Sequence, residues 1–200
     1  MDEKIQQVRD FHGHFCPGLS IGIRAAQISL REIGAHSQDE EVVAIVETDM
    51  CAVDAIQFLT GCTFGKGNLI HRDYGKNAYT FIRRSDNKSI RVVTKPFEWG
   101  QGVNTQEFQT LNAKIRDGGG SAEDKKRFWE LQELRSLAVL EMPEEHMFEV
   151  QEIEVDLPKK ARIHNSLICE ECGESTMETR MRRFNGHNLC LPCFQKAEER

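Results

Sequence analysis

The chain has 200 residues, 39% of them hydrophobic and 29% charged, with a formal net charge of −6 at pH 7. This length allows one medium-sized domain and a small additional module. No apolar run approaches the length needed to span a membrane, and the acidic balance disfavours nucleic acid as a partner. Since the first residues lead into an amphipathic segment rather than a signal peptide, we expect a cytoplasmic protein. Structural disulfides are rare in that compartment, so the seven cysteines require another explanation.

A short helix is expected over residues 3–11, and it leads into the sequence Phe-His-Gly-His-Phe-Cys-Pro-Gly at residues 11–18. Two imidazoles and one thiol lie within five residues there, those of His12, His14 and Cys16. Helical periodicity from Pro17 to about Ile33 places the thiol at a helix N-terminus, where the dipole favours a thiolate. We favour a metal site or a reactive thiol over a loop with two surface histidines and a buried cysteine.

A buried strand is predicted over residues 41–47, followed by a helix from about Ala52 to Leu59 that Gly61 closes. Asp49 is the expected N-cap residue of this helix, so Cys51 would lie in its first turn. Two cysteines that each begin a helix form a pattern that packing alone would not be expected to produce.

A basic loop that contains glycine is expected over residues 63–72, directly after a third cysteine, Cys62. The loop lacks the spacing of a P-loop, so a turn that requires positive φ is the simpler interpretation. Lys66 and His71 are nevertheless candidates to contact an anionic ligand, although such charges more often belong to a solvated face.

The rest of the core alternates strands and helices. Strands are expected at 77–84, 89–94 and 148–157, and helices at 104–116 and 122–140. A capping box formed by Asn104 and Glu107 would open the first of these helices. We therefore expect an α+β core domain over residues 1–157, in which helices pack on a mixed β-sheet.

Residues 158–200 carry the strongest signal in the chain. Two Cys-x-x-Cys pairs, separated by seventeen residues, have the spacing of a tetrahedral zinc site: Cys169, Cys172, Cys190 and Cys193. A strand from Met177, a type I′ turn at Asn185-Gly186, a return strand and a short helix would form a treble-clef or ribbon-like finger. A redox dithiol is the weaker alternative. Three arginines along the first strand suit nucleic acid or a docking partner, and the acidic core favours docking or stability.

Three stretches, in this order, resemble the family of the formylmethanofuran dehydrogenase E subunit: residues 12–18 with 22–24, residues 47–57 and residues 61–69. The resemblance covers roughly residues 5–155, and the tail looks like the auxiliary treble-clef finger of some members. It implies an α+β core, often dimeric, with a metal held by His and Cys. On matching positions that indicates His14, Cys16 and Cys51, with His12, Asp49 and Cys62 nearby.

Two functions from different classes remain open. In the first, the chain is a metal-binding accessory protein that holds zinc or another transition metal in its core. It would form a homodimer through the core and use the zinc finger to dock on a larger molybdenum or tungsten enzyme. In the second, the chain is a metal-dependent enzyme that acts on a small anionic or carbonyl substrate at an open coordination position. Nothing in the sequence offers a pterin or an iron–sulfur cluster site.

Overall fold

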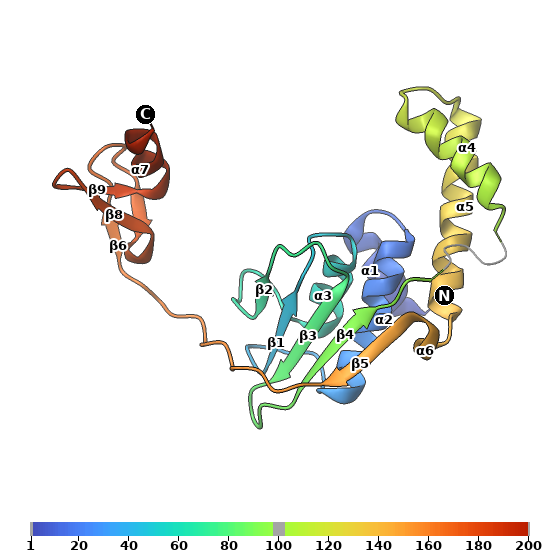
Figure 1. Ribbon diagram of the computed structural model, residues 1–200, viewed down its shortest axis with the longest axis horizontal. Coiled ribbons are helices and arrows are strands. Elements are labelled where there is room, and N and C mark those ends of the chain that lie inside the picture. Colours follow the sequence, from blue (N-terminus) through green and yellow to red (C-terminus); the bar gives the residue numbers. More distant parts are fainter. Residues whose placement is uncertain (1, 98–102, 200) are drawn as a thin grey trace. The chain divides into compact units, whose positions relative to one another are not determined.

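The computed structural model describes residues 2–97 and 103–199, which form two units, Met1–Lys160 and Ala161–Arg200 (Figure 1). We predicted the boundary at Pro158. The residues just after that point stay with the core, because Arg84 Nη1 donates to the Pro158 carbonyl oxygen at 2.6 Å. The first unit packs helices on a mixed sheet and the second is a four-cysteine zinc-binding module, so the predicted fold class is confirmed.

Five strands form the sheet of the core unit, in the order β2-β1-β3-β4-β5. Their bounds are β1 Val42–Val46, β2 Leu69–His71, β3 Ala78–Arg83, β4 Ser89–Thr94 and β5 Phe148–Glu152. β1 pairs with β2 in parallel, and the other neighbours are antiparallel. β2 lies inside the segment that we predicted as a loop, because three residues are too few to show a period. β5 stops at Glu152 rather than Leu157, because its partner β4 begins at Ser89 and offers no further residues.

Three helices cover one face of the sheet: α1 Glu3–His12, α2 Pro17–Glu32 and α3 Ala52–Thr60 (Figure 1). The apolar side of α2 packs on the sheet through residues such as Ile21, Ala25 and Ile28. At Gly22, α2 passes so close to α3 that an added Cβ would come within 2.2 Å of the Ala52 carbonyl oxygen. Glycine is therefore required at this crossing if the N-termini of α2 and α3 are to lie together.

The opposite face of the sheet is closed by the chain that follows β5. Val43, Ile45 and Ile82 are buried there, and the partly buried Ile70 and Val155 pack against them. Ile153 N–H donates to the Ser89 carbonyl at the start of this crossing. The sheet is consequently buried on both faces at β1 and β3, in agreement with the near-continuous apolar run of β1.

Helices α4 Thr105–Arg116 and α5 Ala122–Glu141 form an antiparallel hairpin, followed by the single turn α6 Glu144–Met147 (Figure 1). Asn104 Oδ1 caps α4 by accepting from the Glu107 N–H at 3.0 Å. The reciprocal half of our predicted capping box is missing, because the Glu107 carboxylate pairs with Arg127 instead. A complete capping box occurs at the start of α5, where Ser121 and Asp124 satisfy each other's backbone.

The second unit is built from short elements: β6 Ser166–Ile168, β7 Ser175–Met177, the 3-10 turn η1 Glu178–Arg180, β8 Met181–Phe184, β9 His187–Cys190 and α7 Leu191–Glu198. The strand predicted from Met177 is thus interrupted by η1 and resumes at Met181. Asn185 and Gly186 connect β8 to β9 with φ values of 49° and 88°, and a type I′ turn requires positive φ at both positions. Among all described residues, no helix is both long and apolar enough to cross a membrane.

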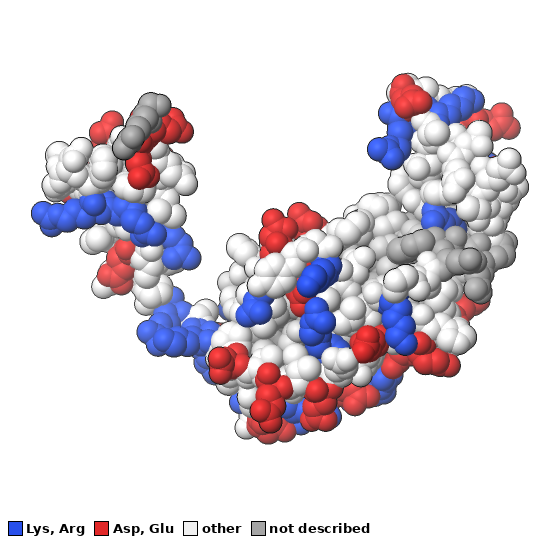
Figure 2. Space-filling model, viewed as in Figure 1, with Lys and Arg blue, Asp and Glu red and all other residues white. Residues whose placement is uncertain are grey.

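Charge is distributed differently over the two units on the face seen in Figure 2. Basic and acidic side chains are interspersed over the core unit, whereas basic side chains gather in a band on the second unit. Arg180, Arg182 and Arg183 are exposed in this part of the second unit. The visible face of the core therefore offers no extended patch of one sign.

Candidate metal centre

Four side chains meet at the helix-covered side of the core unit. One nitrogen or sulfur atom from each of His12, His14, Cys16 and Cys51 lies within 4.8 Å of the other three. His12 is the last residue of α1, His14 lies in the following loop, and Cys16 and Cys51 are the N-cap residues of α2 and α3. Three chain segments that are separate in sequence thus converge through helix ends.

Local backbone chemistry explains this convergence. Gly13 ends α1 in the left-handed conformation, with φ of 87°, and so reverses the chain between the two histidines. Pro17 occupies the first position of α2, where its missing N–H costs no helical hydrogen bond. A Cβ at Gly18 would lie 3.3 Å from Cys51 Cβ and 3.9 Å from Cys16 Sγ. The absence of a side chain at Gly18 therefore lets the two thiols approach each other.

His12 is held in one orientation by a carboxylate. Its Nδ1 lies 2.7 Å from Asp54 Oδ2 on α3, and the imidazole is only 10% exposed. The other ring nitrogen, Nε2, is buried and forms no hydrogen bond with any described residue. With Nδ1–H donating to Asp54, Nε2 carries a free lone pair, which is the arrangement of metal-binding histidines that are oriented by a carboxylate. The sequence analysis treated His12 as a neighbour of the site and did not identify Asp54.

The Cys16 thiol differs from our expectation. Its Sγ accepts from the Leu19 N–H at 3.4 Å, as a helix N-cap should. Burial nevertheless raises the pKa of Cys16 to about 11, and the neighbouring Cys51 adds to the rise despite the favourable Leu19 amide. The prediction of a low pKa from the helix dipole alone was wrong, because loss of hydration outweighs the dipole. A bound cation would supply the missing positive charge.

His14 connects this group of donors to the α4–α5 hairpin. Its ring lies 4.3 Å from the His12 ring and 5.6 Å from the Trp129 ring, centroid to centroid. Burial, together with the nearby His12, lowers the pKa of His14, which favours the neutral imidazole that metals bind. Trp129 on α5 is 49% exposed, so it covers the site only partly.

The remaining candidate residues of the core lie outside this group. Asp49 is exposed and is not the N-cap of α3, a position that Cys51 occupies without a side-chain cap. Cys62 is fully buried, its Sγ lies 3.4 Å from the Val42 carbonyl oxygen, and burial raises its pKa to about 11. Lys66 Nζ donates to the carbonyl oxygen of Ser37 at 2.8 Å. His71 is exposed at the end of β2.

The donor set fits a transition metal. Two imidazoles and two thiolates are ligands that zinc and neighbouring borderline metals prefer. Ligand atoms in a tetrahedral zinc site are about 3.3–3.8 Å apart, so atoms that already lie within 4.8 Å need only a small contraction. The orphaned Nε2 of His12 provides an independent indication, because an unpaired buried nitrogen costs about 1–3 kcal/mol unless a partner compensates for it.

The second unit brings its four cysteines together in the same way. Sγ atoms of Cys169, Cys172, Cys190 and Cys193 lie within 4.8 Å of one another. Backbone N–H groups of Cys172 and Cys190 lower the pKa of Cys169 to about 6, which favours a thiolate. His187, which we considered as a substitute ligand, instead has Nδ1 2.9 Å from Glu170 Oε2.

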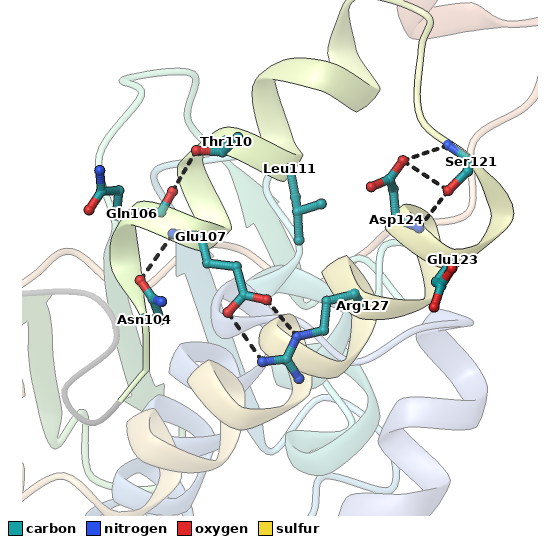
Figure 3. A pocket seen from close by; sticks show the side chains of 9 residues that line it. All are labelled: Asn104, Gln106, Glu107, Thr110, Leu111, Ser121, Glu123, Asp124 and Arg127. Atoms are coloured by element: carbon teal, nitrogen blue, oxygen red, sulfur yellow. Dashed lines mark hydrogen bonds and ion pairs between the residues drawn. The ribbon is translucent and has the colours of Figure 1, made fainter.

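A cavity of about 570 Å³ between α4 and α5 has polar walls but offers little free chemistry (Figure 3). Glu107 and Arg127 point toward each other across it and form a two-pronged ion pair. Asp124 is occupied by Ser121 and Lys114. These interactions hold the two helices together, so we assign the cavity to the structure of the hairpin.

The fold and the donor groups define a class: a metal-binding α+β core joined to a four-cysteine zinc finger. Residues 11–149 match the family described as FmdE, Molybdenum formylmethanofuran dehydrogenase operon, and the chain belongs to this family. Residues 164–199 match the prokaryotic dksA/traR C4-type zinc finger. The resemblance inferred from the sequence is thereby confirmed.

Two individual proteins are similar to the chain. A probable S-adenosyl-L-methionine-binding protein of Archaeoglobus fulgidus is 37% identical over 192 residues, which cover 94% of this chain and 51% of that protein. The chain thus spans about half the length of this curated relative. The crystal structure of an FmdE-like protein of tungsten formylmethanofuran dehydrogenase type, from Syntrophus aciditrophicus, has a TM-score of 0.56 at 22% identity, covering 99% of this chain and 94% of that one. At this identity the likeness concerns the fold.

Proposed function

We propose that the chain is a metal-binding accessory protein with two metal centres. In the core, His12 Nε2, His14, Cys16 and Cys51 hold a transition metal, for which zinc is the first candidate. In the second unit, Cys169, Cys172, Cys190 and Cys193 hold a structural zinc ion. His12 is added to the ligands inferred from the sequence because its Nε2 is buried, unpaired and part of the donor group.

The number of donors favours a binding role over the alternative enzyme. Structural zinc sites are closed by four protein ligands, whereas catalytic sites keep one position for water or substrate. Four donors within 4.8 Å can fill a tetrahedral shell. Lys66, one of the two proposed contacts for an anionic substrate, already donates to a backbone carbonyl. The enzyme hypothesis requires one histidine to leave the metal, and azide binding to the cobalt-substituted protein would reveal such an open position.

The proposed partners follow from the family and from the exposed surface. We propose a cytoplasmic homodimer, formed through the core, that docks on a larger molybdenum or tungsten enzyme through a treble-clef finger. Support for the dimer comes from α4, which has no buried residue within one chain, and from the half-exposed Trp129 and Leu134 of α5. Light scattering of the full chain at tens of micromolar tests this, and a monomer would contradict it.

Metal analysis of cysteine variants tests the two-centre proposal. The full chain should contain about two metal ions, one for each closed four-ligand site. Cys51→Ser and Cys172→Ser should each lose one of them, from different centres. Cys62→Ser is the matched control, since this buried thiol lies outside both groups, and it should keep both ions.

A different result would select the redox alternative. If the full chain, purified from metal-replete cells, contains only the ion that Cys172→Ser removes, the core centre does not exist. Formation of a Cys16–Cys51 disulfide on mild oxidation would then identify these residues as a thiol pair that works without metal.

A further inference from the structure

A cavity of about 760 Å³ opens at the end of the core sheet where β1 begins. It is lined by the loop of residues 33–42 after α2, by residues 83–85 after β3, and by Lys160. The donor group of the metal centre lies beyond the other end of β1, since Cys51 follows that strand. The five residues of β1 separate the two places by about 13 Å or more. The cavity is therefore distinct from the metal centre.

One buried cation in this cavity has an unused edge. The Arg84 side chain is only 10% exposed. Its Nη1 donates to the Pro158 carbonyl oxygen at 2.6 Å, but Nη2 reaches Glu40 Oε2 only at 3.4 Å. Nε is buried, and no described residue accepts its hydrogen. Nε and Nη2 form the edge of a guanidinium that binds a carboxylate with two parallel hydrogen bonds.

The rim of the cavity carries the opposite charge. Asp39 and Glu41 are exposed there, and hydrogen bonds from its own backbone N–H, the Asp39 N–H and the Ser37 hydroxyl lower the pKa of Glu41. These carboxylates would repel a purely anionic ligand. A ligand with a carboxylate for Arg84 and an adjacent ammonium group for the rim is complementary in charge.

The walls are held in place from several sides, so the site is formed before any ligand arrives. Ser37 N–H donates to the Thr60 carbonyl at 2.7 Å, and Lys66 Nζ donates to the Ser37 carbonyl at 2.8 Å. Arg83 Nη1 donates to the Ile33 carbonyl at 2.7 Å. A preorganised cavity loses less entropy on binding than a mobile loop does.

We propose that this cavity binds a zwitterionic carboxylate, namely a free α-amino acid, with its carboxylate on Arg84 and its ammonium group toward Asp39 and Glu41. The volume of the cavity leaves room for a large side chain beyond these two groups. The inference concerns a second ligand of the core unit and does not depend on the metal centre.

Nuclear magnetic resonance of the full chain tests this proposal, because the Arg84 Nε–H is directly observable. Each standard L-amino acid is titrated singly. At least one should shift the Arg84 Nε–H and the backbone amides of residues 34–41 saturably, with a Kd of about 1 mM or lower. Its decarboxylated amine and its N-acetyl derivative each lack one charge and should bind at least about tenfold more weakly.

Variants separate recognition from stability. Arg84→Gln should abolish the shifts, but it also removes the bond to Pro158. Asp39→Asn leaves the fold unchanged, because the side chain is exposed, and should weaken the amino acid severalfold without affecting the N-acetyl derivative. Asp73→Asn, an exposed acid outside the cavity, is the control and should change nothing. If no amino acid shifts Arg84 Nε–H, or if the amine alone binds equally well, the proposal is wrong.

Discussion

The two groups of metal-binding side chains are assembled in opposite ways. In the second unit, the buried residues that the structure describes are Cys169, Leu189 and Cys190, so two of the three belong to the donor group itself. In the core, the donors stand at the ends of helices that pack on a five-stranded sheet. The zinc ion supplies most of what folds the finger, whereas the core folds around its site. Metal removal should therefore have very different consequences in the two units.

The largest expected effect concerns the finger. Cys172→Ser, or excess chelator on the full chain, should unfold residues 166–190 and make them sensitive to protease, because no apolar core replaces the metal. The core should keep its thermal transition. Limited proteolysis with mass analysis measures both units in one experiment. A finger that remains protected in excess chelator would contradict the account.

The next effect is specific to the core. Gly22→Ala places a Cβ 2.2 Å from the Ala52 carbonyl oxygen and must push α2 and α3 apart. We expect a loss of about 2–3 kcal/mol in the free energy of unfolding of the core, together with loss of the core metal and retention of the finger zinc. Denaturant unfolding and metal analysis measure this.

Gly65→Ala is the matched control, because nothing lies within 4 Å of the added methyl group. It should bind both metals and unfold like the original chain. If Gly22→Ala also behaves in this way, close packing of the two helices does not form the site.

A smaller effect tests the carboxylate behind His12. Asp54→Ala should weaken core metal binding about 10- to 100-fold, because the imidazole loses its orienting hydrogen bond, while the fold remains intact. Asp54→Asn keeps an acceptor for Nδ1–H and should lose less. Competition with a chromophoric chelator gives the affinities, and circular dichroism checks the fold. Asp49→Ala, an exposed acid outside the donor group, should have the original affinity.

The smallest effect gives a signal that distinguishes the two centres. Both tryptophans of the chain precede residue 158, and Trp129 contacts the His14 ring. Cobalt(II) bound in the core should quench tryptophan fluorescence, whereas cobalt(II) in the finger should not. The quenching should persist in Cys172→Ser and disappear in Trp129→Phe. Quenching that is lost in Cys172→Ser instead would place the responding metal in the finger.

The sequence predicts the two units to different depths, for physical reasons. The finger is readable because its donors are close in sequence and because a two-residue turn with Asn185-Gly186 has few alternatives. In the core, strong periodicity predicts α2, α3, β3 and β4, and the His-Gly-His-Phe-Cys stretch identifies the first half of the site. β2 escapes prediction because it is short and gains its stability from pairing with β1.

The core site itself depends on tertiary contacts. The pairing of His12 with Asp54 joins residues on different helices, and no local pattern indicates it. The rise in the pKa of Cys16 likewise follows from burial and from Cys51, which the helix-dipole argument does not include. Sequence reasoning therefore locates residues of this centre but does not give its complete donor set or its electrostatics.

X-ray absorption at the zinc edge tests the central claim, that the core holds a second metal with two nitrogen and two sulfur ligands. The full chain is stripped of metal, refolded with zinc alone and freed of unbound ions. Averaged over a four-sulfur finger and the core centre, each zinc ion should then have about three sulfur and one nitrogen neighbours, and Cys172→Ser should change this to about two and two. A first shell of sulfur alone, with one zinc ion per chain, would contradict the account.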